Sequence, residues 1–93
     1  MERRKLSENE VKTALEGLKG WEFDDDKIEK KCKFENFATA LAFVSKVGEI
    51  AESLDHHPDV KFGWGYAEIE TTTHDRGGVT DFDIVLARRI DQL

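Results

Sequence analysis

The segment Asn36–Pro58, NFATALAFVSKVGEIAESLDHHP, contains the longest helical pattern of the chain and two adjacent histidines before its only proline. Asn36 can cap a helix, and the apolar spacing that follows predicts a helix that runs almost to the histidines. Pro58 ends any continuation, so His56 and His57 should lie on the turn that leaves this helix. The segment therefore predicts a central helix that ends in a polar turn bearing two imidazoles.

The helix expected at 37–54 is apolar over roughly half of its circumference, more than an ordinary surface helix buries. One edge forms a row of the kind that packs helix against helix: Phe43, Val47, Ile50 and Leu54. The opposite edge can cover the domain's own sheet: Phe37, Leu41, Val44, Gly48 and Ala51. We therefore expect the first row to lie at a subunit contact, and the protein to be an oligomer.

Upstream of this helix the sequence predicts one helix and one β-hairpin. Ser7 can cap the first helix, and Glu10 completes a capping box three residues later. The stretch 21–34 alternates between apolar and polar residues around an acidic turn at 24–26, which is typical of a hairpin. Lys30 is the one charged member of the inward-facing set.

Downstream, the sequence predicts two more strands and a last helix. The extended stretches are 60–62 and 64–73, and the glycines around Trp64 indicate a bulge or bend. Thr80 can cap the last helix, with Asp83 at the capping-box position. The order αββαββα predicts an α+β fold, with three helices packed on one face of a four-stranded antiparallel sheet.

Length and composition narrow the class of protein. The 93 residues suggest a single domain, 1–93, and a net charge of -6 argues against nucleic-acid binding. The lone cysteine excludes an internal disulfide and a cysteine-rich zinc site. The N-terminus lacks the pattern of a secretory signal, and no apolar run is long enough to span a membrane. We expect a cytoplasmic protein that binds neither nucleic acid nor membrane.

All three histidines lie between positions 56 and 74, near the ends of predicted elements. Histidine is the side chain that most readily exchanges a proton near neutral pH, so His56, His57 and His74 are candidates for proton transfer. A zinc site of three histidines is a less favoured alternative, because adjacent histidines are an awkward first pair for one metal ion. The simplest alternative is that these histidines are exposed loop residues.

Two carboxylates lie close to the histidines in the sequence or in the expected fold. Glu52 precedes His56 by four residues and borders the apolar arc of the central helix. It either points toward the histidine turn or is one more solvated glutamate. Asp83 has a simple structural explanation as the capping-box partner of Thr80.

Taken together, these residues resemble the signature of the pterin-4a-carbinolamine dehydratases. The resemblance covers nearly the whole chain and rests on several spaced elements: Glu52, His56-His57-Pro58, Trp64, Thr73-His74, Gly77-Gly78, Thr80 and Asp83, with Phe43-Val44-Ser45-Lys46-Val47 upstream. It implies the same four-stranded, three-helix fold. It also implies a homodimer, or a homotetramer through the central helix.

The resemblance further implies dehydration of 4a-hydroxytetrahydropterin to quinonoid dihydropterin, which recycles the cofactor of aromatic amino acid hydroxylases. No metal and no organic cofactor is expected. By the same resemblance the three histidines form the proton-transfer and substrate-orienting set, with His57 favoured as the principal acid/base. The substrate-binding positions would be Glu52, Pro58, Thr72, Thr73 and Asp83.

Two other classes of function stay open on the sequence. Some relatives also act as dimerisation cofactors for a transcription factor, and the broad apolar helix suits a protein partner as well as it suits self-association. A metal-binding protein is the third class, and a purified protein without bound metal would exclude it. The presence of all three histidines favours the enzyme.

Overall fold

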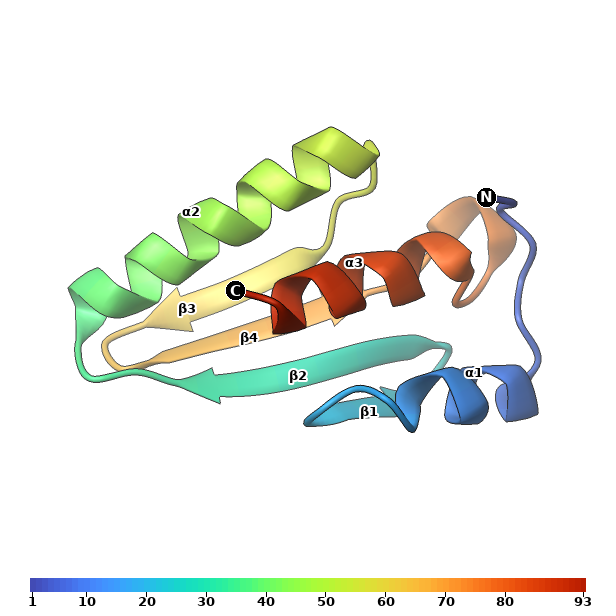
Figure 1. The fold of residues 1–93 in the computed structure, drawn as a ribbon, viewed down its shortest axis with the longest axis horizontal. Helices are drawn as coiled ribbons and strands as arrows, with labels where there is room; N and C mark the ends of the chain where they lie inside the picture. Colours follow the sequence, from blue (N-terminus) through green and yellow to red (C-terminus); the bar gives the residue numbers. More distant parts are fainter.

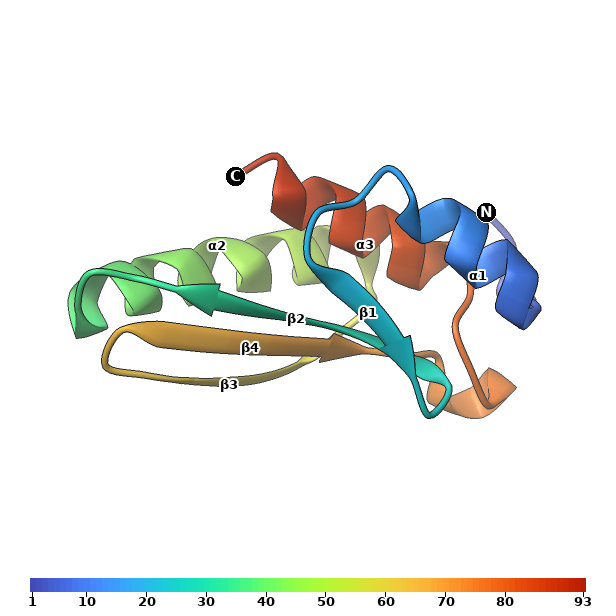
Figure 2. The ribbon, with the colours of Figure 1, turned by 90° about the horizontal axis from the view of Figure 1, so that it is seen from below.

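The structure is a computed structural model that describes residues 1–93. In chain order its elements are α1 (Glu8–Leu15), β1 (Trp21–Asp24), β2 (Lys27–Lys33), α2 (Phe37–Leu54), β3 (Asp59–Gly63), β4 (Tyr66–Thr71), the 3₁₀ helix η1 (His74–Arg76) and α3 (Asp81–Asp91). The three α-helices cover one face of the sheet and leave the other face open (Figure 1, Figure 2). The predicted α+β fold and its αββαββα order are confirmed.

The strands form one antiparallel sheet in the order β1-β2-β4-β3. The β1–β2 hairpin turns at Asp25 and Asp26, whose φ angles are positive, a conformation that aspartate adopts more readily than most residues. Because β3 and β4 are antiparallel, with Asp59 opposite Glu70, the loop that precedes β3 and the loop that follows β4 lie at the same end of the sheet.

The second hairpin differs from the expectation at its turn. The glycines around Trp64 were expected to mark a bulge or bend in extended chain. Gly63 instead pairs with Tyr66, so Trp64 and Gly65 form a two-residue connection between β3 and β4. Gly65 has a φ of 82°, which glycine adopts without steric cost.

Each helix begins at the cap that the sequence predicts. Ser7 caps α1, Asn36 caps α2 and Thr80 caps α3, and all three are complete capping boxes. These caps satisfy N–H groups that the first helical turn leaves without partners. The local chemistry of the sequence therefore fixes where the three helices start.

Lys30, the awkward charged residue of the first hairpin, has a partner in α3. Its Nζ lies 2.9 Å from Oδ1 of Asp91, and the Nε1–H of buried Trp21 donates to the same oxygen over 2.9 Å. Burial by itself raises the pKa of Asp91, but the hydrogen bonds from Lys30 and Trp21 outweigh it and hold the pKa below its ordinary value. The inward-facing lysine thus ties the hairpin to the last helix.

The two edges of α2 are reversed relative to the sequence prediction. Val47, from the row expected at a subunit contact, is fully buried in the core, and Phe43, Ile50 and Leu54 pack against that core. The edge expected to cover the sheet is the more exposed one, with Phe37 46% and Leu41 44% exposed; of that edge only Ala51 is buried. Any contact through α2 would therefore use the Phe37 and Leu41 side.

Candidate active site

The turn after α2 directs its two histidines to different surroundings. Asp55 ends α2 in the left-handed conformation, and the backbone N–H of His56 donates to Ala51 O over 3.1 Å. His56 is buried, whereas His57 is exposed. In Figure 1 this turn lies at the same end of the molecule as η1 and the N-terminal segment.

His56 is held by a buried carboxylate. Its Nε2 lies 2.5 Å from Oδ1 of Asp83, which is fully buried at the start of α3. Thr71 donates to the same oxygen, and Oδ2 accepts from the hydroxyl of Thr73 and the backbone N–H of Thr80. The Asp83 carboxylate thus accepts four hydrogen bonds, which cross-link β4, α3 and the histidine turn.

A second side of the His56 ring meets the N-terminal segment. The guanidinium of Arg3 places Nη1 3.3 Å from Nδ1 of His56, and Nη2 donates to Asp55 O over 3.3 Å. The same guanidinium lies over the ring of Phe82, 4.1 Å from its centroid. Both nitrogens of His56 therefore have partners inside the protein.

His57 forms an exposed pair with Glu52. Its Nε2 lies 2.5 Å from Oε2 of Glu52, and the hydrogen-bonded pair lies on the solvent side of the turn. No other hydrogen bond of the protein uses the His57 ring, so Nδ1 is free to meet a ligand. Of the two sequence alternatives for Glu52, the structure favours the one in which it points toward the histidine turn.

His74 begins η1, and no hydrogen bond joins it to the other two histidines. It lines a polar hollow of ≈ 270 Å³ with Thr72, Asp26 and Asp59, among other polar residues. Neither His56, His57 nor Glu52 lines this hollow, although Asp59 follows the histidine turn in the chain. Thr72 faces this side and donates to Asp26 O, whereas Thr73 faces Asp83.

The site contains residues that the sequence did not single out. Thr71 ends β4, and Thr73 follows two residues later in extended conformation, so both side chains face Asp83. Arg3 lies 53 positions from His56 in the chain, and no local pattern points to that contact. Pro58, half-buried, follows the histidines and separates the turn from β3.

Comparison with known proteins then decides the family. Residues 4–93 match the family described as Pterin 4 alpha carbinolamine dehydratase. The chain belongs to the pterin-4a-carbinolamine dehydratase family. A relative from Sulfurisphaera tokodaii is 43% identical over 90 residues, covering 97% of each chain. One from Aquifex aeolicus is 44% identical over 97% of this chain and 91% of its own, and both are named for this dehydratase, a hydro-lyase.

Two solved structures share the fold of this chain. The crystal structure of a transcriptional coactivator/pterin dehydratase from Brucella melitensis matches with a TM-score of 0.91 and 35% identity over 96% of this chain and 97% of that one. A pterin dehydratase-like RuBisCO assembly factor of the alpha-carboxysome shares the fold at 20% identity, with a TM-score of 0.63 over 77% of this chain and 83% of that one.

No helix of the present chain has the length and hydropathy needed to cross a membrane.

Proposed function

We propose that this chain dehydrates a 4a-hydroxytetrahydropterin to quinonoid dihydropterin, with His57 as the principal acid/base. Family membership supports the reaction. The exposed His57–Glu52 pair is the observation that carries the mechanism. The activity would serve to recycle the tetrahydropterin that aromatic amino acid hydroxylases consume.

The reaction needs one proton to be given and one to be taken. Dehydration breaks the C4a–O bond and forms a C4a=N5 double bond. A proton from the enzyme joins the hydroxyl, which leaves as water, and the proton of N5 passes back to the enzyme. The enzyme thus ends each cycle in its starting protonation state, and imidazole suits both transfers because it gains and loses protons near neutral pH.

Glu52 would orient the His57 ring for proton transfer. A carboxylate hydrogen-bonded to one ring nitrogen fixes the orientation of the imidazole and stabilises the imidazolium that exists before or after transfer. Because Glu52 holds Nε2, the free Nδ1 is the atom we assign to the substrate. Glu52 also offers an acceptor for the N–H groups that a pterin ring presents.

His74 is the proposed second proton-transfer or orienting group, at the polar hollow that it lines with Thr72. His56 would act differently, because burial and its bond to Asp83 withdraw it from solvent. We assign His56 to orientation of the turn, and Asp83 and Thr73 to its support from within the protein. Pro58 would fix the turn between the histidines and β3.

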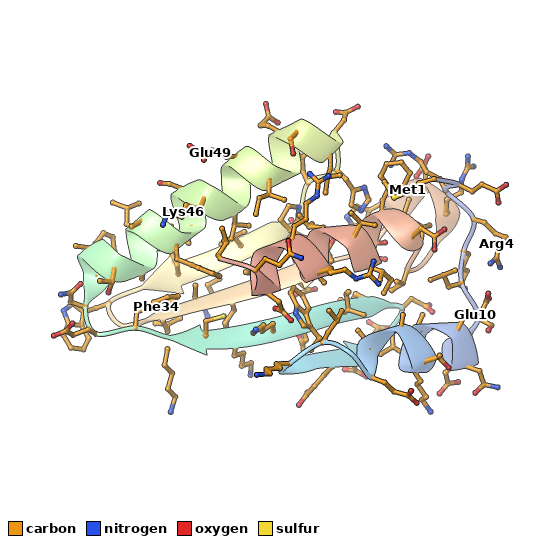
Figure 3. The ribbon with its side chains drawn as sticks, in the orientation of Figure 1. Met1, Arg4, Glu10, Phe34, Lys46 and Glu49 are labelled. Carbon is orange, nitrogen blue, oxygen red and sulfur yellow. The ribbon has the colours of Figure 1, made fainter.

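The test is an assay of carbinolamine dehydration with the purified protein. We expect the wild type to accelerate the reaction and His57→Ala to lower kcat roughly 10²-fold with the fold intact, the contribution of one general acid/base. Lys46→Ala, on the outer side of α2 (Figure 3), serves as the matched control and should keep the wild-type rate. An inactive wild type, or an unchanged rate in His57→Ala, would overturn the proposal.

The same assay addresses the metal-binding alternative. Dialysis against a strong chelator should leave the rate unchanged, because the histidines are assigned to proton transfer. A loss of rate that zinc restores would favour a metal site instead.

A role in protein interaction is the second candidate, and exposed apolar side chains favour it. Phe37, Leu41 and Trp64 are all exposed, with Trp64 72% exposed. Phe37 also contacts Phe62 of β3, which extends this surface from α2 to the sheet. We propose that this surface serves self-association into a homodimer or homotetramer.

A further inference from the structure

The N-terminal segment brings a cation to a site built by residues far along the chain. Leu6 is buried and its backbone N–H donates to Val79 O over 2.8 Å, which fixes the segment next to the start of α3. Three residues earlier, the partly buried Arg3 reaches the His56 ring, the carbonyl of Asp55 and the face of Phe82. Three separate contacts therefore hold one guanidinium against the histidine turn.

The chemistry of these contacts fixes the protonation of His56. A guanidinium has only donors, so Nδ1 of His56 must accept from Arg3 and must be without a proton. The ring proton then lies on Nε2, which donates to Oδ1 of Asp83. His56 is therefore the neutral Nε2–H tautomer, with each nitrogen in the only role that its partner allows.

We propose that Arg3 is a positioning residue of the dehydratase site, which holds the His56 ring in its Nε2–H form against Asp83. Because His56 and His57 are neighbours on the same turn, an anchored His56 ring also fixes the position of His57. The consequence for catalysis rests on the proposed function above. The tautomer of His56 and its contact with Arg3 do not, and can be measured independently of any activity.

The chain offers a matched control in the next residue. Arg4 also lies in the N-terminal segment, but its guanidinium forms a bidentate pair with Glu10 of α1 (Figure 3) and no hydrogen bond to His56. The hydrogen bonds from Arg4 and from Ser7 hold the pKa of Glu10 at about 2. Arg3→Met and Arg4→Met remove the same charge from adjacent positions and keep an apolar stem, and only the first touches the site.

The experiment is ¹⁵N NMR of the histidine rings at neutral pH, in the wild type and the two variants. In the wild type, the His56 ring should show an unprotonated Nδ1 and a protonated Nε2. In Arg3→Met, the Nδ1 resonance should move to that of a ring nitrogen that accepts no hydrogen bond from the protein. Arg4→Met should match the wild type. A wild-type ring with its proton on Nδ1, or the same Nδ1 resonance in all three proteins, would overturn the proposal.

Activity gives a second readout. Arg3→Met should lower kcat by about tenfold, whereas Arg4→Met should stay within about twofold of the wild type. Arg3→Lys keeps the charge and should restore much of the wild-type NMR signature. If no protein shows dehydratase activity, the proposed function fails, yet the NMR result still decides whether Arg3 controls His56. If Arg3→Met keeps full kcat while the Nδ1 resonance of His56 moves, the assignment of Arg3 to positioning for catalysis is wrong.

Discussion

Replacement of Asp83 by asparagine should destabilise the protein far more than the small difference in size between the two side chains suggests. The carboxylate accepts four hydrogen bonds, from His56, Thr71, Thr73 and the backbone of Thr80, and is fully buried. Asparagine has nearly the same shape but only one acceptor oxygen. Its NH₂ group must face two of the four donors, whichever way the amide is turned.

The cost follows from which donors can adapt. A threonine hydroxyl can rotate to accept from the NH₂ group, but the N–H of Thr80 cannot, and His56 cannot accept on Nε2 without placing a proton against Arg3. One buried donor is then left without a partner, which costs about 1–3 kcal/mol. The bonds that survive lose their charge assistance, about 1 kcal/mol each. The free energy of unfolding should therefore fall by about 3–5 kcal/mol.

Urea unfolding followed by circular dichroism measures this change. Asp81→Asn is the matched control, because Asp81 lies in the same first turn of α3 but is exposed and makes no side-chain hydrogen bond. It should cost less than about 1 kcal/mol, the effect of one charge at a helix N-terminus. If Asp83→Asn is no less stable than Asp81→Asn, the network does not hold the site together and the reasoning is refuted.

Two further predictions concern pH and assembly. Asp91, whose pKa is lowered by its bonds to Lys30 and Trp21, should contribute stability that is fully present above the ordinary value of 3.8 and is lost as the pH falls through the lower folded-state pKa. The difference in unfolding free energy between the wild type and Asp91→Asn should therefore be constant near neutral pH and shrink in acid; a difference that is unchanged in acid would contradict this. Leu41→Glu, on the exposed edge of α2, should reduce the mass measured by light scattering while circular dichroism stays unchanged; a monomeric wild type would exclude self-association.

The sequence predicts those parts of the structure that depend on local chemistry. The capping residues Ser7, Asn36 and Thr80 each start a helix as expected, because a cap acts on the N–H groups of the next few residues. Pro58 likewise follows the end of α2, so that His56 and His57 lie on the turn after the helix, as expected. The order of elements, and with it the fold class, follows from such local signals.

Features that depend on distant packing are not predictable in this way. The periodicity of α2 shows that the helix is apolar on a wide arc, but which edge lies against the sheet depends on how β3 and α3 pack beneath it. Val47 and Leu41 therefore exchanged their expected places. Arg3 and His56 lie 53 positions apart in the chain, and no local sequence pattern near either residue predicts their contact.

The same distinction applies to the three histidines. Their clustering indicates proton transfer, but the sequence alone does not divide the roles among them. The structure separates them by environment: His56 has both nitrogens occupied, His57 has one nitrogen free beside Glu52, and His74 lines a separate polar hollow. Environment of this kind depends on the burial of each ring, which adjacent positions in a turn do not share.

The most direct measurement of the central claim is rescue of His57→Ala by added imidazole in the carbinolamine dehydration assay. His57 is exposed, so its removal leaves a position that free imidazole can reach from solvent. If His57 transfers the protons, the roughly 10²-fold loss in kcat should be partly reversed as the imidazole concentration rises, and the rescue should follow the neutral and protonated forms of imidazole with pH. A folded His57→Ala variant that keeps the wild-type rate, or one that loses the rate and regains none of it at any imidazole concentration, would contradict the assignment of proton transfer to His57.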